Sequence, residues 1–394
     1  MLKLRFDWRD IFRAPRLALS LQRIWIELVG LTIGYAVYLV ATFAAIMAAG
    51  LPLKSAWLQN GLLPCLFTLG EKAPWYSWVI YAFGCLFLLF SLMLAAAAAA
   101  RAIYMTSKGN AFYTWKEAYA FTFRKAGSIL MTPISLAVII GLMVLGAWVI
   151  GLLGKIPYVG ELGVSLFTLI WLFSALLLFF FFIVTIVAAI LSPVIITTTD
   201  EDAFEAVFQS FSITWSRPWR FLFYEALTVV LSLAAAAGLA FFIKEAVVIM
   251  NRLFSWFMGG DYINLANNGQ AMLQSWFLAA QPLLEKIYGR VTEYIYFNRE
   301  FVLIPANTLP KTVVISSYLY AFSLLFAVGS VVSYALATFT AGNTLLFLLI
   351  KKDKDEENLL ERKDKEEESE ETEEEEKKEE VKTEDEKKEE TSAQ

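Results

Sequence analysis

The stretch SPVIITTTDEDAFEAVFQSFSITWSRPWRFLFYEAL, residues 192–227, interrupts a chain that is otherwise strongly apolar. Bulky apolar residues end directly before it, and a second apolar run begins inside it. Between the two runs stand three threonines, three acidic residues, a patterned segment and the tetrapeptide Arg-Pro-Trp-Arg. Such an interruption is typical of a connection between two membrane-spanning helices, because charged groups favour the aqueous boundary of a bilayer.

Within the elbow 192–220, the pattern of apolar residues predicts an amphipathic helix. Large apolar side chains recur along one face at helical spacing: Phe204, Val207, Phe208, Phe211 and Trp215. The acidic residues 200–202 stand where they stabilise a helix N-terminus through its dipole, and the threonines 197–199 are interpreted as caps at that helix start. We therefore expect a helix that lies in the membrane interface, with its aromatic face toward the lipid.

Tryptophan, arginine and lysine side chains in such connections predict membrane-interface anchors, because they prefer the headgroup layer. The predicted anchors are Arg101, Trp115, Arg124, Lys125, Trp215, Arg217, Trp219 and Arg220. The segment 110–130 repeats the order of aromatic helix, basic cluster and span, and the segment 6–25 does so with looser spacing. We interpret the chain as three units, each with an interfacial helix, an outward span, an outer loop and an inward span. Independent convergence of the flanks is the alternative.

The apolar residues predict an all-α polytopic membrane protein with six transmembrane helices joined by cytoplasmic amphipathic elbow helices. The chain is 58% hydrophobic, against about 45–50% in soluble domains, and the excess collects in long runs. The predicted spans are residues 28–49, 75–100, 128–153, 165–191, 221–243 and 313–345, within a transmembrane domain of residues 24–350. Each can cross about 30 Å of hydrocarbon. The last uncharged run, 313–350, is read as one tilted crossing rather than two short ones.

Lysine and arginine in the flanks predict the orientation, because cytoplasmic loops carry an excess of these residues. The first 23 residues contain six of them and residues 101–125 contain five, whereas the two short loops on the opposite side contain Lys54, Lys72 and Lys155. The six basic residues of the loop 244–312 count for less, because that loop is long. We therefore expect both termini in the cytoplasm and residues 1–23 as a cytoplasmic interfacial amphipathic helix. The loop 244–312 is expected outside, with an amphipathic segment at 270–297.

The C-terminal residues 351–394 differ from the rest of the chain in composition. They contain 11 Lys/Arg and 22 Asp/Glu, whereas the preceding 350 residues contain 22 basic and 16 acidic residues. Only three apolar aliphatic residues interrupt this Glu/Lys-rich sequence before its last four positions. An excess of like charge without apolar residues for a core predicts a disordered cytoplasmic tail.

The sequence contains few groups for chemistry. It has no histidine and two cysteines, and it lacks a metal-ligand cluster, a phosphate-binding loop and a dinucleotide fingerprint, so we predict no catalytic residues, cofactor or metal. Glu27 and Glu225 are possible buried charges, which we expect to reach the interface or to pair with the nearby Arg23 and Arg220. Small residues at Gly30-x-x-x-Gly34, 95–100 and 234–238 predict surfaces for close helix packing.

A family resemblance follows from the opening stretch. An apolar span ends at Pro193, an amphipathic helix with Ala206, Ser210 and Trp215 follows, and the aromatic-basic pair Trp219-Arg220 opens the next span. This order resembles bacterial membrane proteins related to the glycerophosphoryl diester phosphodiesterase membrane domain. The resemblance implies a membrane module without the catalytic barrel, because spans, elbows and tail use the whole chain. Members without that barrel are largely of unassigned function.

The leading functional hypothesis is therefore a non-enzymatic protein of the bacterial inner membrane that acts as a structural or lipid-associated envelope module. Its expected partners are membrane lipids, with a homo-oligomer or other membrane proteins as further possibilities and no nucleic acid. One alternative is a transporter or channel for a small or lipidic solute, which needs a polar path between the spans. Another is a lipid enzyme that uses the carboxylates of Glu117, Asp200, Glu201 and Asp202.

Overall fold

The computed structural model describes residues 4–67, 73–277 and 308–362, and this part of the chain is 86% helical and contains no strand. Six of its helices are long and apolar enough to cross a membrane. They are α2 (Leu21–Ala48), α4 (Trp75–Lys108), α5 (Trp115–Leu153), α7 (Thr168–Thr199), α9 (Pro218–Met258) and α13 (Lys311–Asp355). The expected all-α, multi-pass architecture is confirmed.

The observed helices run past the predicted spans, mostly at their charged ends. α4 continues through Arg101 to Lys108, and α5 begins 13 residues before the expected position 128. A hydropathy pattern stops at the first charges, whereas a helix continues as long as its backbone hydrogen bonds form. The last run is one unbroken helix of 45 residues, as a single tilted crossing requires.

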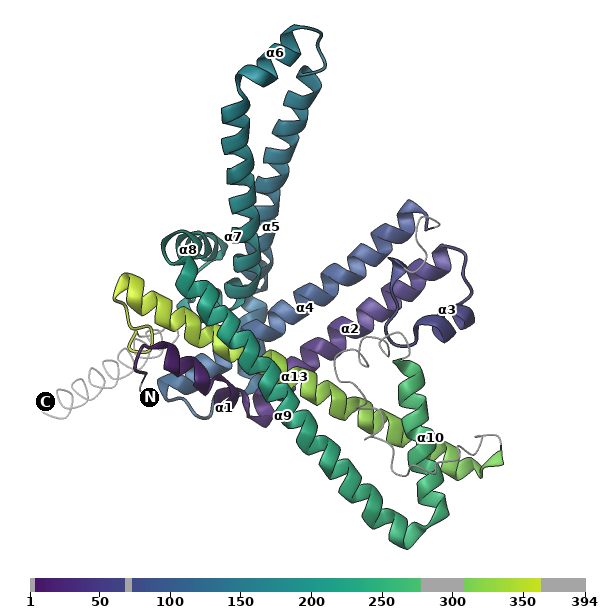
Figure 1. The fold of residues 1–394 in the computed structure, drawn as a ribbon. Helices are drawn as coiled ribbons and strands as arrows, with labels where there is room; N and C mark the ends of the chain where they lie inside the picture. The colour runs from purple at the N-terminus through teal and green to yellow at the C-terminus, as the bar shows by residue number, and fades with distance from the viewer. Residues whose placement is uncertain (1–3, 68–72, 278–307, 363–394) are drawn as a thin grey trace, which may run out of the picture.

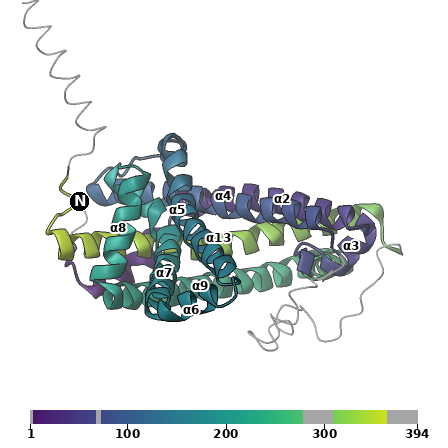
Figure 2. The ribbon, with the colours of Figure 1, turned by 90° about the horizontal axis from the view of Figure 1, so that it is seen from above.

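The six long helices form three hairpins, α2–α4, α5–α7 and α9–α13, which splay apart from a common end (Figure 1). We call this common end the base; it holds the N-terminal residues, α8 (Ala203–Ser216) and the end of α13 (Figure 2). The opposite ends, the tips, hold α3 (Leu53–Asn60), α6 (Val159–Leu166) and α10 (Gly260–Trp276). The order of outward helix, tip and inward helix agrees with the three predicted units.

The largest buried cluster lies in the base, where α4, α7 and α13 meet. Small residues make this contact close, since the alanines 97–100 have no exposed surface. The α2–α4 hairpin uses the same principle at Gly34, where an added Cβ would lie 2.8 Å from Cβ of Ser91. The predicted small-residue packing is confirmed for Gly30, Gly34 and the alanine run, whereas Gly238 has nothing within 4 Å of an added Cβ.

The N-terminal 23 residues do not form the single interfacial helix that we expected. A 3-10 helix, η1 (Trp8–Arg13), leads into the short α1 (Ala14–Ala18), and the chain breaks at 19–20 before α2 begins. The buried carboxylate of Asp10 accepts hydrogen bonds from the backbone N–H groups of Arg5 and Phe6, at 2.7 and 2.9 Å. Those bonds hold residues 5 and 6 in a turn directly before η1.

The second expected elbow, within 110–127, is not a separate helix. α5 begins at Trp115 with a capping box, in which Thr114 and Glu117 exchange side-chain and backbone hydrogen bonds, and then continues unbroken to Leu153. No proline lies at the junction between the aromatic segment and the span. Pro133 lies further along, inside the span itself. The third elbow does form a separate helix, α8, between Asp202 and Arg217.

The fold extends beyond residue 351, where we expected the disordered tail to begin. α13 ends at Asp355, and Leu359 and Leu360 are buried against the base. The hydroxyl of Tyr104 donates a hydrogen bond of 2.8 Å to the carbonyl oxygen of Leu359. Residues 351–362 therefore belong to the folded part, and residues 363–394 lie outside the described residues. The part of the outer amphipathic segment from 278 to 297 also lies outside them, whereas its beginning belongs to α10.

Replacing Gly34 with leucine is expected to lower the stability of the α2–α4 hairpin by about 1–3 kcal/mol, because the new side chain meets Ser91. The measurement is the thermal unfolding midpoint of the purified protein in a mild detergent. Gly146→Leu is the matched control, since it makes the same gain in helix propensity at a position with nothing within 4 Å. Equal midpoints for the two variants would contradict the close approach of α2 and α4.

Candidate functional site

Arg101 lies at the centre of the base and is fully buried. Its Nη1 donates a hydrogen bond of 3.0 Å to the carbonyl oxygen of Thr197, and its guanidinium carbon lies 4.0 Å from the ring centroid of Phe121. A carbonyl from the last turn of α7 and an aromatic face both stabilise a buried cation. The predicted role of Arg101 as an interface anchor is wrong, because the adjoining alanines bring this turn of α4 into the core.

The threonines 197–199 form the last turn of α7. Our prediction that they cap the start of a helix is therefore wrong. Each hydroxyl donates to a carbonyl oxygen four residues earlier in the same helix, at 2.6 to 2.8 Å. The turn ends at Asp200, which has a left-handed backbone with φ of 56°. The three hydroxyl groups thus bond within their own helix. The group of this turn that binds Arg101 is the backbone carbonyl of Thr197.

Arg101→Leu is expected to lower the free energy of unfolding by about 1–3 kcal/mol, because the buried carbonyl of Thr197 loses its donor. Arg101→Lys should recover part of this loss, since lysine keeps the charge without the planar fork. Chemical or thermal unfolding in detergent measures the effect. The control is Arg252→Leu, which removes an exposed arginine from a long helix, and an equal loss there would refute a special role for Arg101.

Glu27 and Glu225 both face α13. Glu27 on α2 is 1% exposed and accepts a hydrogen bond of 2.9 Å from the hydroxyl of Thr340. Glu225 on α9 is partly buried, and the side chain of Asn343 lies beside it. Within the described part of the chain, neither carboxylate forms the expected ion pair with an arginine, and Arg220 pairs with Asp353 instead. Our pairing prediction is therefore wrong.

The polar partners on α13 were missed in the sequence, although a signal for them exists. They belong to the segment TFTAGNT, residues 338–344, which is a short polar run inside the last apolar span. The whole segment except Phe339 is buried in the structure. A cluster of hydroxyl and amide groups within a span indicates contact with other polar groups, because such groups are costly to place against lipid.

The other predicted anchors fall into two groups at the base. Trp115, Trp215 and Trp219 are exposed, and so is Arg124. The remaining basic residues, Lys125, Arg217 and Arg220, form ion pairs within the protein. Lys125 pairs with Asp200 at 2.7 Å, and Arg217 pairs at 3.1 Å with Asp353, which Arg220 also contacts. The tryptophans are thus the anchors most available to a surrounding lipid layer.

The aromatic face of α8 is partly exposed and partly packed on α7, where Phe211 lies 5.2 Å from Phe180. Its buried positions are Ala206, Gln209, Ser210, Ile213 and Thr214. Phe204 and Phe208 are exposed, and the ring of Trp215 packs at 5.6 Å against Phe180 of α7 while the residue stays 72% exposed. Of the face that we expected to contact lipid, the protein leaves Phe204 and Phe208 uncovered, whereas Val207 and Phe211 pack against α7.

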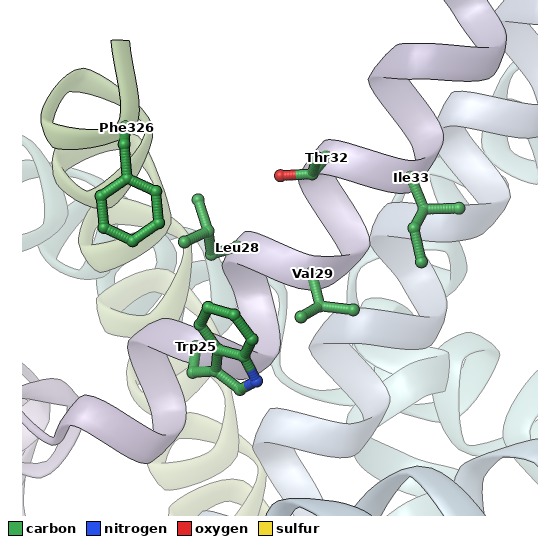
Figure 3. Close-up of a pocket in the computed structure, with 6 residues that line it drawn as sticks. All are labelled: Trp25, Leu28, Val29, Thr32, Ile33 and Phe326. Carbon is green, nitrogen blue, oxygen red and sulfur yellow. The ribbon is translucent and has the colours of Figure 1, made fainter. Parts of the chain in front are cut away.

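An apolar groove of about 270 Å³ lies between α2 and α13. It is lined by Trp25, Leu28, Val29, Thr32, Ile33 and Phe326 (Figure 3). The two helices touch at Gly329, where an added Cβ would lie 3.2 Å from Leu28. The two hairpins separate beyond this contact (Figure 1) and meet again near their tips, where the Leu62 N–H donates a hydrogen bond of 2.7 Å to the Trp276 carbonyl oxygen. Apart from the hydroxyl of Thr32 and the indole N–H of Trp25, the lining offers no polar side-chain group. The volume lies just below the range of about 300–1,000 Å³ for small-molecule pockets.

These features define an all-α, multi-pass membrane protein with a buried polar base and an apolar lateral groove. No family model matches the chain, and neither a curated protein nor a solved structure does so. The resemblance to the membrane domain of glycerophosphoryl diester phosphodiesterases therefore stays a prediction. Within the described residues, no group of three or more His, Cys, Asp or Glu side chains could hold a metal ion.

Proposed function

We propose that this chain is a lipid-associated structural module of the bacterial inner membrane, which acts without catalysis and has both termini in the cytoplasm. The observation that carries the proposal is the groove between α2 and α13, whose lining is almost entirely apolar (Figure 3). A lipid acyl chain fits the chemistry of this lining, because it is apolar and reaches the groove from within the bilayer. The module would thus hold one or more lipids between its hairpins.

The distribution of aromatic and basic residues supports the proposal. The exposed Trp215 and Trp219 adjoin Arg217 and Arg220 at the base, next to the aromatic face of α8. Tryptophan at the boundary of a bilayer places its ring among the headgroups, and arginine nearby favours phosphate. This arrangement would fix the depth of the base in the lipid layer.

The proposed orientation rests on the same residues. Basic side chains at the base, among them Arg124, Lys125, Arg217 and Arg220, outnumber those at the described parts of the tips, which include Lys54, Lys155, Arg252 and Lys311. The positive-inside rule then assigns the base to the cytoplasm. Because six crossings return the chain to the side on which it started, both termini share that assignment.

Lipid retention tests the proposed function. Thr32→Trp fills the groove and is expected to remove the phospholipid that the wild-type protein keeps through extraction in a mild detergent, as measured by native mass spectrometry and lipid extraction. Val40→Trp is the matched control, because Val40 lies on the same helix, is 72% exposed and does not line the groove. A wild-type protein without retained lipid, or equal retention by the two variants, would contradict the proposal.

Cysteine labelling tests the orientation in a background with Cys65 and Cys85 replaced by serine. With a membrane-impermeant maleimide on intact cells, we expect Glu161→Cys in α6 to be labelled and Ser216→Cys at the end of α8 to be protected. Both positions are exposed in the structure, so the membrane alone decides their reactivity. After permeabilisation both variants should react, and the reverse pattern in intact cells would invert the topology.

A further inference from the structure

The crossing of α9 and α13 brings several polar groups together inside the protein. Glu225 and Thr228 lie three positions apart on α9 and therefore on the same face of that helix. An added Cβ at Gly342 of α13 would lie 2.8 Å from the Thr228 hydroxyl oxygen, so this hydroxyl lies against the α13 backbone. Asn343 follows directly in sequence, and its side chain lies beside the Glu225 carboxylate.

These groups include buried polar atoms without hydrogen bonds of regular geometry. The Asn343 side chain lies within hydrogen-bonding reach of the Glu225 carboxylate. Even so, Oε2 of Glu225, the hydroxyl of Thr228 and both amide atoms of Asn343 lack a hydrogen bond of regular geometry within the described part of the chain. Thr228 and Asn343 are 0% and 1% exposed. Other threonines in these spans, such as Thr338 and Thr344, donate to a carbonyl four residues earlier. Thr228 does not, so its oxygen is available to a different group.

Unsatisfied buried polar atoms indicate a missing occupant, because their desolvation is costly unless something replaces the lost water. The available ligand atoms are a carboxylate oxygen, a hydroxyl oxygen and an amide carbonyl oxygen. Oxygen sets of this kind suit hard cations. A single carboxylate among neutral oxygens balances one positive charge, which favours a monovalent ion over Ca²⁺ or Mg²⁺.

We propose that Glu225, Thr228 and Asn343 form a binding site for a monovalent cation, Na⁺ or K⁺, at the crossing of α9 and α13. The cation takes the place of the positive partner that Glu225 lacks, since Arg220 is engaged by Asp353. The Asn343 amide presents its oxygen to the ion and its N–H group to the carboxylate. Gly342 permits the close approach of the two helices that brings these oxygens together.

The test measures the thermal unfolding midpoint of the full-length protein in detergent at constant ionic strength, as choline chloride is replaced by NaCl or by KCl. The wild-type midpoint is expected to rise by several degrees and to saturate with one or both ions, because a ligand that binds only the folded state stabilises it. Glu225→Gln and Thr228→Val should abolish this rise. Glu245→Gln, the same change at a half-exposed site on the same helix, should keep it.

Direct binding of radiolabelled ²²Na⁺ or ⁸⁶Rb⁺ to the wild-type protein provides a second readout that does not depend on how well the variants fold. Saturable binding that Thr228→Val weakens at least tenfold supports the site. A wild-type midpoint that follows pH but neither ion, without saturable binding, overturns it in favour of a proton on Glu225. An ion response that persists in Glu225→Gln also overturns it.

Discussion

The close contact of α4 with α7 and α13 at the base is the interaction on which the rest of the structure depends. Between helices in lipid there is no hydrophobic driving force, so association relies on close packing of small residues and on hydrogen bonds. The alanines 97–100 provide the packing, and Arg101 adds a hydrogen bond to Thr197 at the same place. Toward the tips the three hairpins splay apart in Figure 1, and large parts of the helix flanks remain exposed.

α13 organises the polar interior of this base. It contacts α1, α2, α4, α7, α9 and α10, and its buried segment 338–344 faces the two carboxylates that enter from α2 and α9. Both acids stand near the start of the first helix of their hairpin, so the first and third units each direct one carboxylate at the same helix. The groove lies between α13 and α2, and the proposed cation site lies between α13 and α9. A ligand bound at either site would therefore contact α13 and stabilise its position.

The sequence predicts those features that depend on neighbouring residues along the chain. The six spans, the separate helix α8, the outward aromatic face with Phe204 and Phe208, and the packing of Gly34 follow from local pattern. Features that depend on a partner far along the chain could not be predicted. Arginine at the end of an apolar span is typical of an interface anchor, and Arg101 becomes a core residue only because α7 and Phe121 approach it. The pair Leu359–Leu360 gives no signal of burial within an acidic stretch, and its burial follows from the contact with Tyr104 of α4.

The two ends of the chain are joined in this fold, since the hydroxyl of Tyr334 bonds to the Pro15 carbonyl oxygen at 3.1 Å and Thr340 bonds to Glu27. During synthesis, the first hairpin therefore enters the bilayer long before its partner helix exists. The 313 residues that separate Glu27 from Thr340 take roughly 15–60 s to translate at about 5–20 residues per second. For that interval the carboxylate of Glu27 lacks its final donor, and the nascent protein must shield it with water, with a proton or with the insertion machinery.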